Sequence, residues 1–121
     1  MENIKEKILE LKKEKNALIL AHYYVPGDVQ DIADEVGDSF ALAKKAKETD
    51  ADIIVFCGVH FMAESAKLLN PRKKVLLPDM SAGCTMADMV TKDDVLKLKA
   101  KYPKAKVCTY VNSTADVKTV S

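Results

Sequence analysis

Short apolar runs, separated by longer stretches of mixed polarity, dominate the pattern of this chain. The runs are Leu18–Ala21, Ile53–Phe56, Val75–Leu77 and Val107–Thr109. Continuous apolar runs of this length are typical of strands that are buried on both faces of a parallel sheet. The chain is therefore predicted to contain four parallel strands.

The stretches between the runs predict helices. Ile4, Ile8 and Leu11 are spaced to form one apolar face, which predicts an amphipathic helix over about residues 3–14. Capping residues and helix breakers predict the others. Asp28 is expected to cap a helix over 29–36, Asp38 or Ser39 the next one, and the Thr91 to Asp94 sequence a later one that ends at Pro103. A further helix is predicted over about 60–69, a short one after the loop that contains Ser81, and a last turn from Ser113 or Thr114.

Strands that alternate with helices in this way predict an α/β fold. The connections are long enough for right-handed crossovers, so we expect a three-layer αβα domain with a four-stranded parallel sheet in the order 2-1-3-4. A length of 121 residues suits one domain, and we expect residues 1–121 to form it.

Composition and charge exclude several classes of partner. The chain is 48% hydrophobic and 31% charged, and its 19 basic and 18 acidic residues leave a net charge of +1. This balance favours neither a nucleic acid nor an anionic membrane as a partner. The lysine-rich start has no apolar stretch resembling a signal peptide, and no run approaches the roughly 20 residues that span a bilayer. Three cysteines without a Cys-x-x-Cys pair indicate reduced thiols and a cytoplasmic location.

Polar residues with useful chemistry follow the apolar runs. His22 with Tyr23 and Tyr24 follows the first run, Cys84 lies in a loop after the third, and Asn112 follows the fourth. In open parallel sheets, ligands bind beyond the carboxyl ends of the strands. We therefore expect one active-site edge, with only one of the two tyrosines facing it. The Gly-rich and Walker-type phosphate loops are absent, which disfavours nucleotide binding by those routes.

Several predicted helix starts fall at the same edge, including those at Ser39 and Asn112. Unpaired N–H groups there are suited to a small acid such as a carboxylate or a phosphate. Ser39 alternatively serves only as a helix cap. His22 is suited to proton transfer near neutral pH, or alternatively packs half-buried beside the tyrosines.

Cys84 is the most reactive candidate. It lies in the small-residue loop Ser81–Thr85 at a predicted helix start, a setting that lowers a thiol's pKa. Two readings follow: a nucleophile with His22 as its base, or a ligand to a soft metal. Cys57 and Cys108 lie in apolar runs, where cysteine usually acts as a small hydrophobic residue. An iron–sulfur cluster generally needs three or four cysteines, so any cluster here needs further ligands from elsewhere.

Five motifs in order along the chain resemble the quinolinate synthase family. They are Leu20–Tyr24, Asp31–Ser39, Cys57–Glu64, Leu77–Cys84 and Tyr110–Ser113. Each motif alone is weak, but together they span nearly the whole chain. The resemblance implies a transferase of NAD biosynthesis that condenses iminoaspartate with dihydroxyacetone phosphate to give quinolinate.

The resemblance also implies a set of site residues. Family members contain three similar α/β domains around a 4Fe–4S cluster, and each domain provides one cysteine. By this match Cys84 is the metal ligand of the first domain, and Tyr24 assists proton transfer and closure of the site. The substrate-binding residues would be His22, Ser39, Tyr110 and Asn112.

The length of the chain departs from that of the family. Family members are more than twice as long, and their second and third cluster cysteines lie in later domains. The chain thus resembles the first domain, which by itself is expected to be inactive and to hold no stable cluster. The alternative is a non-enzymatic α/β domain that binds a small dicarboxylate, in which Cys84 has no metal-binding role.

Overall fold

The computed structural model describes residues 3–121 and contains one parallel β-sheet. Its strands are β1 (Ala17–His22), β2 (Glu35–Gly37), β3 (Ile53–Cys57) and β4 (Lys74–Leu76). They lie in the order β2-β1-β3-β4, and each neighbouring pair is parallel. The predicted four-stranded parallel sheet and its order 2-1-3-4 are confirmed, although two of the sheet's residue assignments change, as described below.

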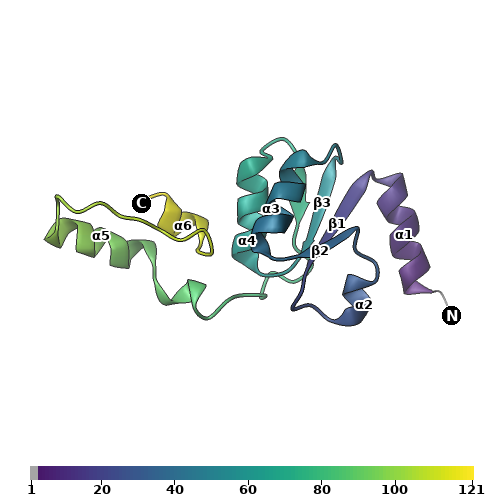
Figure 1. Cartoon of the computed structure of the whole chain (residues 1–121), viewed down its shortest axis with the longest axis horizontal. Coiled ribbons are helices and arrows are strands. Elements are labelled where there is room, and N and C mark those ends of the chain that lie inside the picture. The colour runs from purple at the N-terminus through teal and green to yellow at the C-terminus, as the bar shows by residue number, and fades with distance from the viewer. Residues whose placement is uncertain (1–2) are drawn as a thin grey trace.

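Helices cover both faces of the sheet (Figure 1). On one side lie α1 (Ile4–Glu14) and α2 (Gly27–Gln30), and on the other lie α3 (Ser39–Glu48) and α4 (His60–Leu69). This is the predicted three-layer α/β arrangement, in which helices shield the strands from water on both faces.

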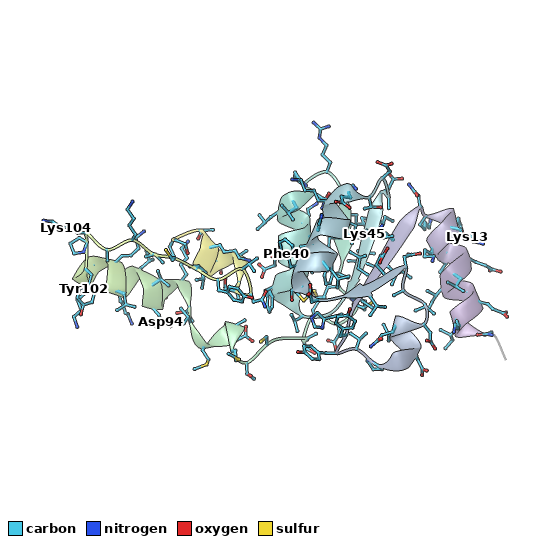
Figure 2. All side chains as sticks on the ribbon, in the orientation of Figure 1. Lys13, Phe40, Lys45, Asp94, Tyr102 and Lys104 are labelled. Carbon is cyan, nitrogen blue, oxygen red and sulfur yellow. The ribbon has the colours of Figure 1, made fainter. Side chains whose placement is uncertain are left out.

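Beyond β4 the chain leaves the sheet. It forms the short 3₁₀ helix η1 (Ala87–Met89), then α5 (Lys92–Lys101) and α6 (Ala115–Lys118). We call residues 91–121 the C-terminal arm; α5 and α6 lie beside each other in it and extend away from the sheet (Figure 1). Tyr102 and Lys104 lie at the end of the arm that is far from the sheet (Figure 2). None of the helices in the described part of the chain is long and apolar enough to cross a membrane.

Two of the elements predicted from the sequence, one helix end and one strand, differ in the structure. Residues 35–37, predicted as the end of a helix, form the edge strand β2, because α2 ends at Gln30 and Asp34 then pairs with Ile19. Residues 107–109, predicted as the fourth strand, lie in the arm without strand structure. Val107 packs there against a small apolar cluster of the arm, and β4 forms the sheet's edge instead.

Most caps follow the sequence prediction. The Asp38 carboxylate accepts a hydrogen bond from Ala41 N at 2.8 Å and caps α3. Thr91 and Asp94 form a reciprocal capping box at the start of α5. Asp28 is not the cap of its helix, because α2 begins after Pro26 and contains Asp28. Since these caps satisfy the N–H groups of the first turn, they fix where the helices begin.

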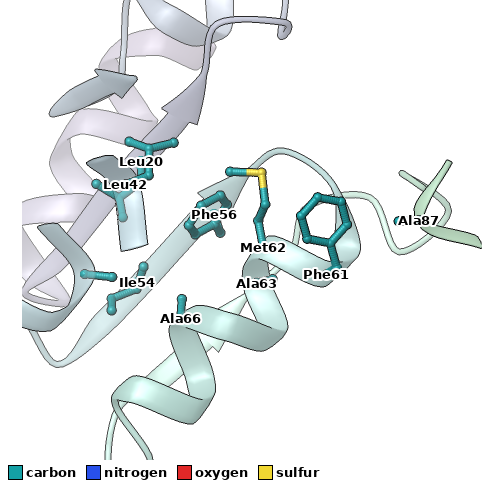
Figure 3. Close-up of a cluster of buried hydrophobic side chains, with 10 residues drawn as sticks. Leu20, Leu42, Ile54, Phe56, Phe61, Met62, Ala63, Ala66 and Ala87 are labelled. Atoms are coloured by element: carbon teal, nitrogen blue, oxygen red, sulfur yellow. The ribbon is translucent and has the colours of Figure 1, made fainter. Parts of the chain in front are cut away.

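The main apolar cluster lies between the sheet and the helices α3 and α4. Leu20, Ile54 and Phe56 are fully buried between the helices, together with α3 and α4 side chains (Figure 3). Burying a side chain of this size contributes about 1.5–3 kcal/mol. A separate small cluster of Val95, Val117 and Val120 stabilises the arm. Whether residues 1–121 behave as one domain stays a prediction.

Candidate functional site

A cavity of about 910 Å³ lies beyond the carboxyl ends of the strands. His22 enters it from the end of β1, Ser39 from the segment after β2, and Cys57 from the end of β3. Cys84 reaches it from the loop after β4, and Asn112 from the C-terminal arm. Residues that are far apart in the sequence therefore share one cavity at the edge predicted from the strand order.

Parallel pairing and one side chain align His22 with Ser39. His22 pairs with Gly37 in the sheet, and Asp34 fixes this register because its carboxylate accepts a hydrogen bond from Ile19 N at 2.8 Å. The other carboxylate oxygen lies 2.7 Å from Lys12 Nζ on α1. Asp34 thus connects α1 and β1 to the residue before β2, and this fixes the strands whose ends form the site.

His22 is held in one tautomer by its neighbour. Its Nδ1 accepts a hydrogen bond from the Tyr24 backbone N–H at 3.2 Å, so the neutral ring carries its proton on Nε2. Burial lowers the pKa of His22, and the negative charge of Asp38 opposes this shift only in part. The imidazole is therefore arranged as a neutral hydrogen-bond donor near pH 7.

Both tyrosines after β1 line the cavity, so the expectation that only one faces it is wrong. The Tyr24 ring stacks on His22 with 4.5 Å between centroids, and Tyr23 meets His22 edge-on at 6.2 Å. The chain turns after His22 and no longer alternates like a strand, which brings both rings to the same side. Tyr24 is 92% exposed and lies at the outer surface of the cavity.

Ser39 does not cap α3. Asp38 caps α3, and the Ser39 hydroxyl instead donates to the sulfur of Met62 on α4 at 3.4 Å. Thioether sulfur is a weak acceptor, so a ligand oxygen can replace it.

The loop that carries Cys84 is fixed at several points. Asp79 accepts hydrogen bonds from the Ser81 hydroxyl at 2.6 Å and backbone N–H at 2.9 Å, and these bonds lower the pKa of Asp79. His60 N donates to the Ala82 carbonyl at 2.8 Å, and Asp88 N donates to the Cys84 carbonyl at 2.9 Å. Cys84 lies before η1 in irregular structure, so the predicted helix start at this residue is wrong.

Asn112 and Tyr110 come from one turn of the arm but differ in position. Asn112 lines the cavity, whereas Tyr110 is absent from its lining and is 75% exposed. The Ser113 hydroxyl donates to the Tyr110 carbonyl at 2.7 Å and tightens this turn. Of the proposed substrate-binding residues, the structure thus brings His22, Ser39 and Asn112 together with Cys84.

Two residues of the site could not be recognised from the pattern of polar residues in the sequence. Cys57 lies in an apolar strand yet borders the cavity, and burial raises the pKa of its thiol. Met62 occupies a buried helical position but contacts the Ser39 hydroxyl. Hydrophobicity alone predicts that both are core residues. Only the position of Cys57, at the end of its strand, indicates that it lies near the site.

The donors present fit an iron–sulfur cluster in kind but not in number. Thiolate is a suitable ligand for such iron, and Cys84 offers one sulfur at the cavity. Within residues 3–121, no group of three or more His, Cys, Asp or Glu side chains is arranged to hold a metal ion. A cluster bound at Cys84 would therefore need ligands from outside the part of the chain described.

Comparison with known proteins gives a consistent family match. The family described as quinolinate synthetase A protein matches residues 6–121. Proteins named quinolinate synthase are 62% identical over 116 residues in a Sulfurihydrogenibium species (96% of this chain, 38% of that protein). The quinolinate synthase of Clostridium acetobutylicum is 62% identical over 117 residues, which are 97% of this chain. That of Aquifex aeolicus is 58% identical over 118 residues, which are 98% of this chain. The chain spans 39% and 37% of the length of these two relatives.

Proposed function

This chain belongs to the quinolinate synthetase A protein family, and we propose that it forms the N-terminal α/β domain of a quinolinate synthase and contributes part of its active site. The proposed reaction is the condensation of iminoaspartate with dihydroxyacetone phosphate to quinolinate in NAD biosynthesis. The observation that carries the proposal is the cavity in which His22, Ser39, Cys84 and Asn112 meet. These residues belong to four of the five motifs that resemble the family.

The chemistry of the cavity supports binding of a dicarboxylate-like substrate. His22 would donate from Nε2, Asn112 from its amide, and Ser39 from its hydroxyl, and all three donors suit carboxylate oxygens. Tyr110, two residues before Asn112 on the same turn, is the fourth proposed contact. Because His22 is neutral near pH 7, its role is to donate a hydrogen bond rather than to supply a full charge.

Tyr24 is the proposed residue for proton transfer. Its ring lies over His22 at the outer surface of the cavity, and its phenol is exposed to solvent. A phenol both donates and accepts a proton in hydrogen bonds, and stacking on His22 limits its movement. Tyr24 would thus assist proton transfers to and from the intermediate and cover the site during the reaction, with His22 as the second catalytic group.

Cys84 is the proposed ligand to a 4Fe–4S cluster. The hydrogen bonds at Asp79, Ala82 and Asp88 hold its loop at the cavity, so its sulfur is positioned without any contribution from Cys57 or Cys108. When bound, such a cluster would supply an iron with an open coordination position that acts as a Lewis acid. Two further cysteines would come from other domains of the longer protein.

The remaining domains would cover surface that is exposed in this chain. Large apolar side chains are exposed on η1, α5 and the turn before α6: Met86, Met89, Leu96, Leu98, Tyr102, Tyr110 and Val111. Exposed apolar surface of this extent usually marks an interface. We therefore propose that further domains, about three in all, cover this surface in the longer protein. The isolated first domain would be inactive and would hold no stable cluster. From the composition of the chain we also propose a cytoplasmic enzyme without nucleic acid or membrane partners.

A chimera tests the proposed function. The 121-residue chain replaces the matching segment of the Sulfurihydrogenibium quinolinate synthase, to which it is 62% identical. The chimera, reconstituted with iron and sulfide without oxygen, should form quinolinate, and Cys84→Ala should abolish both cluster binding and product. A folded chimera that binds the cluster but makes no quinolinate would contradict the proposal.

The alternative, a dicarboxylate-binding domain, is tested with the chain itself. Titration with succinate should show no tight binding to the 121-residue chain if the site needs further domains. Micromolar affinity that Cys84→Ser leaves unchanged would instead support the binding-domain function.

A further inference from the structure

Glu64 links the sheet to the C-terminal arm. This residue ends the motif Cys57–Glu64, yet none of the site chemistry above uses it. Its Oε1 lies 3.2 Å from His60 Nδ1 on the preceding turn of α4 and accepts a hydrogen bond from Ala115 N, in α6, at 3.5 Å. The Glu64 side chain is only 26% exposed.

A second contact beside Glu64 joins the same two helices. The Lys118 amine of α6 donates to the Ser65 hydroxyl of α4 at 3.2 Å. Burial lowers the pKa of Lys118, and the negative charge of Glu64 opposes that shift. The Glu64 carboxylate therefore faces two cationic or proton-donating groups, His60 and Lys118, and one backbone donor of the arm.

The position of Asn112 depends on this junction. Asn112 is three residues before Ala115, and the Ser113 hydroxyl bond to the Tyr110 carbonyl closes the turn that contains Asn112. The other residues of the site, such as His22 and Cys84, belong to the sheet and its loops. Bonds within the arm, such as Lys99 Nζ to Val120 O, hold α5 to α6 but do not fix the arm against the sheet.

We propose that Glu64 is a positioning residue that holds Asn112 at the cavity by accepting the hydrogen bond from Ala115. The inference extends the proposed function, since that function gives Asn112 its role in binding. The core does not depend on Glu64, because α4 is anchored through Phe61, Met62 and Ala66, which are all buried. Loss of Glu64 should loosen the start of α6, where Ala115 lies, and leave the sheet and the bond between Lys118 and Ser65 in place.

Amide hydrogen exchange of the 121-residue chain, followed by NMR, tests the proposal without substrate, so its failure and that of the proposed function are distinguishable. Glu64→Leu removes the acceptor at similar helix propensity, Glu64→Gln keeps an acceptor oxygen, and Glu48→Leu at the exposed end of α3 is the matched control. The bond from Ala115 N to Glu64 Oε1 is long at 3.5 Å, so its loss should accelerate exchange by a few fold, up to about tenfold.

In Glu64→Leu we expect the Ala115 amide to exchange a few fold to about tenfold faster, while those of Leu20 and Phe56 keep their rates. The side-chain amide resonances of Asn112 should shift, and Glu64→Gln should restore both the rates and the resonances. The proposal is overturned if Ala115 is unprotected in the natural chain, if Glu64→Leu behaves like Glu48→Leu, if core and arm accelerate together, or if Glu64→Gln fails to restore protection.

Discussion

Replacing Asp34 by alanine should destabilise the fold, because this side chain joins α1, β1 and β2. Its carboxylate accepts from Ile19 N at 2.8 Å and from Lys12 Nζ at 2.7 Å, and its own N–H donates to the Ile19 carbonyl at 2.8 Å. Asp34→Ala keeps the backbone bond but removes both side-chain contacts. Ile19 is 4% exposed, so its N–H would be left buried without an acceptor.

The magnitude follows from those two contacts. A backbone donor that loses a charged acceptor in a buried position costs about 1.5–3 kcal/mol. The Lys12 ion pair has side-chain exposures of 18% and 29%, and partial screening limits it to roughly 0–1 kcal/mol. Asp34→Ala should therefore cost about 1.5–4 kcal/mol. Asp34→Asn retains an acceptor for Ile19 and Lys12→Met removes only the ion pair, so each should cost about 1 kcal/mol or less.

Urea unfolding of the 121-residue chain, followed by circular dichroism, measures these differences in the free energy of unfolding. The expected order of destabilisation is Asp34→Ala well above Asp34→Asn, with Lys12→Met the mildest. If Asp34→Ala and Lys12→Met cost the same within about 0.5 kcal/mol, the Ile19 hydrogen bond does not fix β2 to β1, and the reasoning is refuted.

Three further predictions concern His22, the cysteines and the glycines. Since burial lowers the pKa of His22, the unfolded chain takes up this proton at higher pH than the folded chain, so stability falls as pH drops below the usual histidine range. Urea unfolding at pH 7 and pH 5 should show a larger loss for the natural chain than for His22→Gln, and equal losses would contradict the assignment. Alkylation at neutral pH, followed by mass spectrometry, should label exposed Cys108 first and Cys57 last, because Cys57 is half-buried and burial raises the pKa of its thiol. Labelling of Cys57 as fast as Cys108 would contradict this. Gly37→Ala should destabilise by about 1 kcal/mol in thermal unfolding, because a Cβ there would lie 3.3 Å from the Ala41 Cβ, whereas Gly27→Ala, with no atom within 4 Å, should be neutral or stabilising.

The long apolar runs made much of the fold predictable. β1 and β3 coincide with Leu18–Ala21 and Ile53–Phe56, because these runs are apolar on both faces and need helices on both sides. β2 was not predictable in this way. Only Val36 of its three residues favours a strand, since Glu35 and Gly37 are depleted in strands, and β2 forms because Asp34 binds Ile19 across the sheet, a tertiary contact that no local pattern indicates.

The candidate site was predictable where it follows from strand order. His22 and Cys84 follow strands of a parallel sheet, so their convergence depends only on the fold class. Asn112 also reaches the cavity, but from the arm rather than from a fourth strand as the sequence predicted. The arm meets α4 through contacts such as that of Ala115 with Glu64, 51 positions apart in the chain, and no local pattern indicates such a contact.

A spin label on Cys84 gives the most direct test that these residues share one cavity. In a Cys57→Ser, Cys108→Ser chain, the label should broaden the amide resonances of His22, Ser39 and Asn112, and spare those of Asn16 and Asp52 at the opposite ends of the strands. The same label on Cys108, with the other two cysteines changed to serine, is the matched control. If the Cys84 label broadens His22 and Asn112 no more than Asn16 and Asp52, the residues do not converge and the account is wrong.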